Sequence, residues 1–302
     1  MSKNESSQQS DQLLSVISAV AEQRRQQAQP VLERRLPEWI LEVVRSEVAY
    51  TLNPRMLPIK QASFPILMRL LEEKYSMKFA PPDLGPFRPN APMSPEELGS
   101  ALMGQLSDRH LRFENGRFPK SRNDFDVVES IRINQESILV SVQGISEIAN
   151  LVVADVAEMI WVSTGVQKSW DEVKQGVQLI GYGTATLVDL GFPSENFIDV
   201  KFLDFIRSEM LSGKKFACEM ARHSARHNFL ASPSLSAIFG LDDLNLNFFT
   251  FDNVTGRSET VKFRFSVITR DSVGTGRLVV MSELPFDKHV ECLEMLIGAM
   301  KA

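Results

Sequence analysis

The chain has 302 residues, of which 43% are hydrophobic and 24% charged, an ordinary composition for a globular protein that buries a sizeable core. Its formal net charge of −5 argues against a general affinity for nucleic-acid backbone. No apolar segment reaches the roughly twenty residues that cross a bilayer, and residues 1–12 lack the features of a secretory signal. Because Cys218 and Cys292 are too few for a disulfide framework, we expect a cytoplasmic protein that does not enter a membrane.

The beginning of the chain predicts a polar tail followed by a helical N-terminal region. Residues 1–12 are rich in Ser, Gln and Asn, which predicts a disordered tail. In residues 13–79, apolar side chains at helical spacing predict helices over residues 13–25, 37–53 and 65–75. The first of these helices either docks on the rest of the protein or is a detachable element. In the second case it binds a partner or pairs with a second copy of the chain.

A proline-rich segment follows this region. Residues 80–95 contain six prolines, whose fixed backbone angle and missing donors predict an extended connection and a domain boundary. Ser94, Pro95 and Glu97 form the pattern of a capping box, so we expect a helix to begin there. The remaining body, residues 96–302, has the pattern of an α+β fold.

Two parts of this body show the same order of elements. In the first, residues 108–165, we expect a hairpin over Leu111 to Phe118 with its turn at Asn115-Gly116, two further strands and a long helix. Those strands and the helix are predicted at residues 127–133, 137–143 and 145–160. In the second part, residues 240–302, we expect strands over 244–254, 259–270 and 275–282 and a helix over 286–300.

We therefore predict two βββα-like units, an internal pseudo-repeat that forms a mainly antiparallel sheet covered by helices. Between the units, residues 177–190 predict a long strand. In the last sheet strands, Phe263 and Phe265 alternate with Arg264, so we expect the phenylalanines to face the core beneath the helix that carries Leu293 and Leu296.

Two histidines are the most notable candidates for chemistry. His223 and His227 are four residues apart, the spacing of paired metal ligands on a helix, and Cys218, His289 and Cys292 are further potential ligands. The HExxH pattern of a zinc protease is missing, so we predict no metal site and no cofactor. We interpret Arg222, His223, Arg226 and His227 as a polar face that contacts an acidic partner.

Sequence motifs of catalysis are missing as well. Neither Gly181-Tyr182-Gly183 nor Gly274-Thr275-Gly276 continues as a phosphate-binding loop, and there is no GxSxG nucleophile elbow. This favours a protein that is not an enzyme. The alternative is an enzyme whose site is assembled between the two α+β units from residues distant in sequence.

A second alternative is binding to DNA. A helix followed by a hairpin at residues 94–122 is the order of a winged helix, and Arg112 and Arg117 would lie on its wing, where they could contact phosphates.

Our first prediction is a non-enzymatic macromolecular-interaction protein that binds a protein partner or associates with itself. The DNA-binding regulator and the enzyme remain the alternatives.

Overall fold

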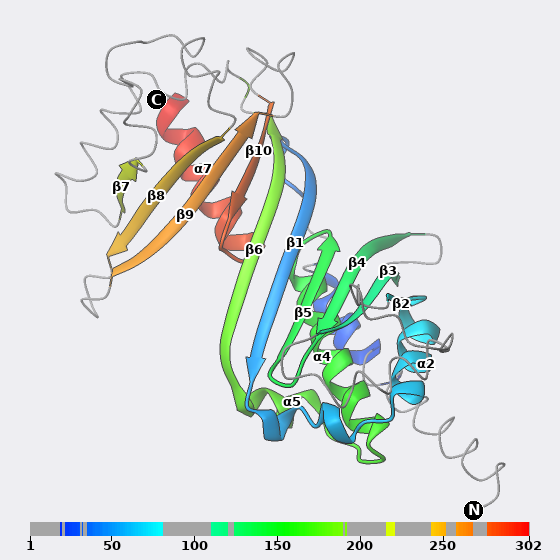
Figure 1. Ribbon diagram of the computed structural model, residues 1–302. Coiled ribbons are helices and arrows are strands. Elements are labelled where there is room, and N and C mark those ends of the chain that lie inside the picture. The colour runs from blue at the N-terminus through cyan, green and yellow to red at the C-terminus, as the bar shows by residue number, and fades with distance from the viewer. Residues whose placement is uncertain are drawn as a thin grey trace, which may run out of the picture. The chain divides into compact units, whose positions relative to one another are not determined.

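The computed structural model describes residues 19, 22–30, 32, 35–80, 110–119, 124–189, 191, 216–220, 243–251, 258–267 and 277–301, which form an α+β fold (Figure 1). These residues belong to two compact lobes. The first lobe lies within residues 1–34 and 46–181, and the second within residues 35–45 and 182–302. The long strands β1 (Ile40–Leu52) and β6 (Val177–Asp189) each contribute residues to both lobes.

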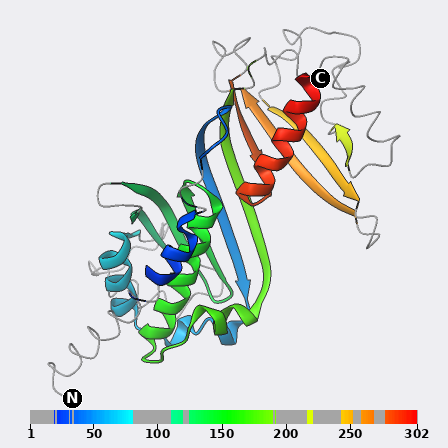
Figure 2. The ribbon, with the colours of Figure 1, turned by 180° about the vertical axis from the view of Figure 1, so that it is seen from behind.

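The first lobe is an antiparallel sheet with its helices packed on one face. Its strands follow the order β2-β3-β4-β5-β1, and every neighbouring pair is antiparallel. The elements are α2 (Phe64–Tyr75), β2 (Lys78–Ala80), β3 (Leu111–Pro119), β4 (Phe125–Ile133), β5 (Ser137–Gln143), α4 (Ser146–Ser163) and α5 (Trp170–Val173), with short 3-10 turns η1 (Pro54–Met56), η2 (Ile59–Gln61) and η3 (Lys174–Gly176). Residues 22–30, 19 and 32 are helical, and Figure 2 shows this N-terminal helix beside α4.

The centre of the first lobe is the interface between α4 and the sheet. Ile138, Val140 and Val142 alternate along β5 and are fully buried, as the predicted period of two requires. Helix α4 packs on β5, and most of its residues are buried, which explains why apolar side chains occur nearly all around it. None of the helices in the described ranges is long and apolar enough to cross a membrane.

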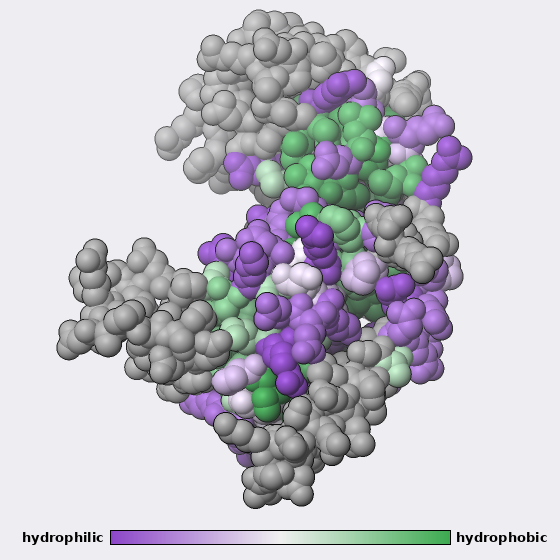
Figure 3. Space-filling view, turned by 90° about the vertical axis from the view of Figure 1, so that its right-hand side faces the viewer, coloured by the Kyte–Doolittle hydropathy of each residue, from purple (hydrophilic) through white to green (hydrophobic). Residues whose placement is uncertain are grey.

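The second lobe has the same kind of sheet. Its strands follow the order β6-β10-β9-β8-β7, again with antiparallel neighbours, and comprise β7 (Phe216–Met220), β8 (Asp243–Phe251), β9 (Ser258–Val267) and β10 (Arg277–Ser282). Helix α7 (Phe286–Lys301) lies on one face of this sheet, as Figure 2 shows. Figure 3 shows a contiguous group of hydrophobic residues on the surface in this view, with hydrophilic residues next to it.

The elements predicted at residues 65–75, 127–133, 137–143, 145–160 and 177–190 are confirmed as α2, β4, β5, α4 and β6. The C-terminal strands and helix are confirmed as β8, β9, β10 and α7. Phe263 is buried and Arg264 is exposed, as predicted, and Leu293 of α7 is buried. The side chains of Phe265 and Leu296 lie outside the described residues. Three strands precede a helix in both lobes, but a relationship between the two as βββα-like units stays a prediction.

The prediction of a helix over residues 37–53 is wrong, because residues 40–52 form strand β1. The N-terminal region is therefore not wholly helical. Ile40, Val43, Val44 and Val48 have helical spacing, yet buried Ser46, Val48, Tyr50 and Leu52 follow a period of two. β1 pairs with β5 over Ser46 to Thr51, so tertiary pairing selected the second pattern. Valine and tyrosine are good strand residues, which the helical interpretation ignored.

The prediction of a hairpin turn at Asn115-Gly116 is also wrong, since both residues lie inside the single strand β3. Asn115 has a left-handed backbone with φ of 59°, but the chain continues instead of reversing. Gly116 is required for another reason. A Cβ atom at this position would lie 2.6 Å from Cγ of Met77 and 3.2 Å from the carbonyl oxygen of Tyr75, so the glycine permits β3 to approach the end of α2.

Several other predictions fall outside the described residues. They are the tail of residues 1–12, the connection from residue 81 to 95, the helix that begins at Ser94, and the polar face of Arg222, His223, Arg226 and His227. The domain boundary placed in residues 80–95 thus stays a prediction.

Candidate functional site: a buried acidic pair beneath the N-terminal helix

Two carboxylates lie in the most apolar helix of the first lobe. Asp155 and Glu158 of α4 are three residues apart and therefore share one face of the helix. Each is only 4% exposed. A buried carboxylate must be paired or hydrogen-bonded. Without such partners, the hydration that it loses on burial costs roughly several kcal/mol. We refer to Asp155 and Glu158 as the acidic pair.

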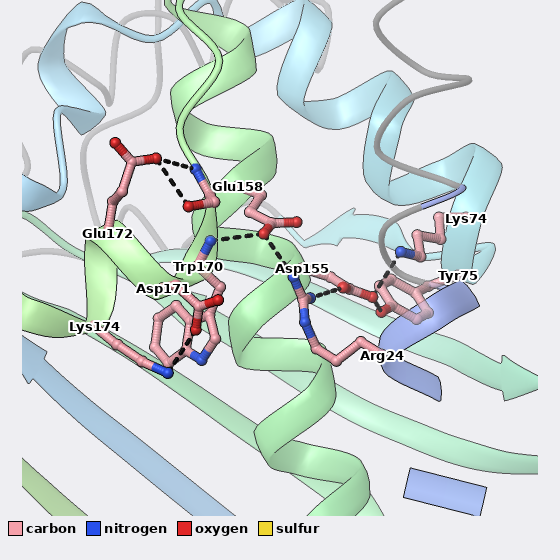
Figure 4. A network of polar contacts seen from close by, with 10 residues as sticks. Arg24, Lys74, Tyr75, Asp155, Glu158, Trp170, Asp171, Glu172 and Lys174 are labelled. Atoms are coloured by element: carbon pink, nitrogen blue, oxygen red, sulfur yellow. Dashed lines mark hydrogen bonds and ion pairs between the residues drawn. The ribbon is translucent and has the colours of Figure 1, made fainter. Parts of the chain in front are cut away.

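The charge opposite the acidic pair comes from the N-terminal helix. One terminal nitrogen of Arg24 lies 2.5 Å from Oδ1 of Asp155, and the other lies 2.5 Å from Oε1 of Glu158 (Figure 4). The planar guanidinium donates a hydrogen bond to each carboxylate and so bridges the two. The Arg24 side chain is 18% exposed, so it closes the site from the solvent side.

The second oxygen of Asp155 is held by the last turn of α2. Nζ of Lys74 lies 2.6 Å from Oδ2, and the hydroxyl of Tyr75 donates a hydrogen bond to the same atom. Ser76 ends α2 in a left-handed conformation with φ of 56°, which places Lys74 and Tyr75 just before the helix terminus. Burial, followed by the charge of Asp155, raises the pKa of Tyr75 well above its ordinary value, so Tyr75 remains a donor.

Glu158 is held from a different direction by α5. The backbone N–H of Trp170 donates to Oε1 of Glu158 at 2.7 Å. Trp170 begins α5, and a capping box fixes this helix start: the Glu172 carboxylate accepts from the backbone and hydroxyl of Ser169 at 2.9 and 2.8 Å. Burial raises the pKa of Glu158 above its ordinary value, and the positive charge of Arg24 opposes this increase.

The described part of the N-terminal helix lies over this site and is only partly covered. No residue among 22–30 is buried, and a cavity of about 170 Å³ remains beside the helix. This cavity is lined by Glu22 and Arg25 of the helix, Lys74 and Tyr75 of α2, Phe118 and Pro119 of β3, and Leu151 and Asp155 of α4. Among the described residues of the helix, Arg24 supplies the ion pairs to α4.

Sequence reasoning missed this site. Asp155 and Glu158 interrupt the apolar pattern of the predicted helix at residues 145–160, and two acids on one face of such a helix were the available signal. Arg24 is 131 residues from Asp155, and no local pattern connects the two.

The predicted binding residues Arg112 and Arg117 lie on β3 and are both exposed. Arg112 forms an ion pair with Glu114, and the guanidinium carbon of Arg117 lies 4.7 Å from the ring centroid of Phe125. Neither arginine contributes to the acidic pair. Because residues 111–119 form one strand, the hairpin expected of the wing is not present there.

The second lobe contains a different buried polar centre. The ring of His289 in α7 is fully buried, with Nε2 at 2.8 Å from Oγ1 of Thr186 and Nδ1 at 2.8 Å from Oγ of Ser282. Burial lowers the pKa of His289 to about 3, so the ring is neutral near pH 7. Burial also raises the pKa of the Cys292 thiol, the opposite of what activates a nucleophile.

In the ranges that the structure describes, no group of three or more His, Cys, Asp or Glu side chains is placed to hold a metal ion. No protein-family model matches the chain, and no curated protein and no solved structure is significantly similar to it.

Proposed function

We propose that this protein is a non-enzymatic macromolecular-interaction protein, and that it binds a protein partner at the acidic pair. One observation supports this above all: the site already holds the guanidinium of Arg24. The helix that supplies it has no buried residue among residues 22–30. Arg24 thus displays the chemistry that the site recognises. A partner that presents an arginine on a helix would meet the same two carboxylates.

The N-terminal helix is suited to being displaced. An isolated helix shorter than about 12–15 residues is marginal in water, so most of the stability of the N-terminal helix must come from docking. When it leaves, water reaches Asp155 and Glu158, while Lys74, Tyr75 and the Trp170 N–H remain to hold them. Displacement therefore does not leave Asp155 and Glu158 buried without water or hydrogen-bond partners.

The helix also competes with the partner. A tethered segment has an effective concentration on the order of millimolar, so a partner in solution must overcome this advantage. Removing the Arg24 guanidinium should weaken the competitor and leave the site intact.

This competition supplies the test. A fluorescent peptide copying residues 19–34 is titrated into the full chain and into its Arg24→Ala variant, and fluorescence anisotropy reports binding. We expect the peptide to bind the variant at least about tenfold more tightly than the unmodified chain. A peptide with alanine in place of Arg24 should bind neither protein.

Two protein controls complete the experiment. Gln27→Ala, an exposed position on the same helix, should leave peptide binding as in the unmodified chain. Combining Arg24→Ala with Glu158→Gln should abolish the gain. If the peptide binds equally well with and without its arginine, the acidic pair is not the binding site. Sedimentation of the unmodified chain then separates a foreign partner from a second copy, because exchange of the N-terminal helix between copies would give a dimer.

A further inference from the structure

The cavity beside the N-terminal helix has donors that the described part of the chain leaves unsatisfied in whole or in part. Nε of Arg25 is buried and has no hydrogen-bond partner there, and Nζ of Lys74 is buried with Asp155 as its one partner. Arg25 approaches Glu22 only at 3.6 Å, which is too long for a hydrogen bond. Lys74 meets one oxygen of Asp155, but an ammonium group has three N–H donors.

The buried acceptor of the cavity, Asp155, is already occupied, and Glu22 lies near a cation. Asp155 interacts with Arg24, Lys74 and Tyr75, and Glu22 with Arg25. A cationic ligand would therefore find only the half-exposed carboxylate of Glu22, whereas an anionic ligand would find two cations with donors to spare. A dianion such as phosphate would be repelled by the carboxylates of Glu22 and Asp155, which favours a single negative charge.

The remaining walls are apolar. Phe118, Pro119 and Leu151 line the cavity, and Tyr75 contributes a buried aromatic ring. The volume of about 170 Å³ is comparable to engineered protein cavities of about 150 Å³ that accept benzene.

We propose that this cavity binds a small monocarboxylate with an apolar body. Its carboxylate accepts hydrogen bonds from Arg25 and Lys74, and its body packs on Phe118, Pro119 and Leu151. Because Arg25 belongs to the N-terminal helix and Lys74 to α2, the ligand ties the helix to the lobe. The inference stands on the cavity alone and does not require the proposed partner. If both hold, the carboxylate opposes partner binding.

The probe is benzoate, titrated into the full chain by calorimetry, with benzyl alcohol as its neutral analogue. We expect saturable binding of benzoate and at least about tenfold weaker binding of benzyl alcohol, because the alcohol lacks the charge-assisted hydrogen bonds. Arg25→Gln should weaken benzoate binding by a similar factor. Arg69→Gln is the matched control, since Arg69 lies on α2, is 40% exposed and does not line the cavity. It should change nothing.

Hydrogen exchange provides a second measurement. Benzoate should slow exchange of the amides in residues 22–30, and in Arg25→Gln this protection should be lost. Equal affinity for benzoate and benzyl alcohol, or benzoate binding that is unchanged in Arg25→Gln, would overturn the proposal. So would the absence of any benzoate binding, which would leave a cavity filled only by water. The peptide assay at the acidic pair contains no benzoate, so the two proposals fail separately.

Discussion

Each lobe buries a group of polar side chains, and the two groups are stabilised in opposite ways. In the first lobe, Asp155 and Glu158 are held as ion pairs, and one of the cations comes from the N-terminal helix. In the second lobe, His289 is kept neutral between the hydroxyls of Thr186 and Ser282 and stacks on Phe263 at 5.6 Å between ring centroids.

The difference lies in where the partners come from. The hydroxyl partners of His289 belong to β6 and β10, neighbouring strands that the sheet itself holds in place. A neutral ring with one donor and one acceptor nitrogen is satisfied by two hydroxyls and carries no charge to attract a ligand. The acidic pair instead needs cations, and one of its two, Arg24, is carried by a helix in which none of residues 22–30 is buried. The proposed displacement by a partner accordingly concerns the charged centre and not the neutral one.

The largest expected effect is at the neutral centre. Phe263 is 1% exposed, so Phe263→Ala removes a buried ring and leaves a cavity against His289. We expect a loss of about 3–5 kcal/mol in the free energy of unfolding, measured by urea denaturation. The neighbouring Arg264 is exposed, and Arg264→Ala should cost less than about 1 kcal/mol. A larger loss for Arg264→Ala than for Phe263→Ala would contradict the register of β9.

A smaller effect follows from acid. The pKa of His289 is lowered to about 3 in the folded protein. In the unfolded chain a histidine has a pKa of about 6.5. Between these values the unfolded chain binds more protons, so stability is lost as the pH falls. Going from pH 7 to pH 4 should cost about 3 kcal/mol from this residue alone.

The measurement is a series of urea denaturations between pH 7 and pH 4, compared with the same series for His289→Gln. The variant is less stable at pH 7 but lacks this titration, so its pH dependence should be flatter by the stated amount. Parallel curves for the two proteins would show that His289 does not resist protonation.

The smallest effect is expected at the charged centre. Breaking a buried ion pair usually costs about 3–5 kcal/mol because a charge is left buried. In Arg24→Met the helix can leave and water can reach the acidic pair, so we expect only about 1–2 kcal/mol. Faster hydrogen exchange should be confined to residues 22–30. A loss as large as that of Phe263→Ala, spread over α4, would show that Arg24 is a fixed part of the core and would count against displacement.

Local patterns predicted the elements whose apolar residues follow a single period along their whole length. The strand β5 and the helix α2 were correctly predicted because each has one apolar period that its surroundings then use. The same holds for α7, whose apolar residues fall on a helical face, whereas α4 was recognised although apolar residues surround it. The candidate site was not predicted, since its members come from the N-terminal helix, α2, α4 and α5.

The sequence by itself thus determined the α+β class, the central strands with their closing helices, and the inward face of Phe263. Tertiary structure decided between two periods in β1, because pairing with β5 stabilises the extended form whatever the helical spacing of its valines. It made Asn115 and Gly116 a left-handed position and a close approach to α2 instead of a turn. It also placed Arg24 on Asp155 and Glu158. Hydrophobic periodicity is a property of neighbours along the chain, whereas an ion pair depends on charges that only folding brings together.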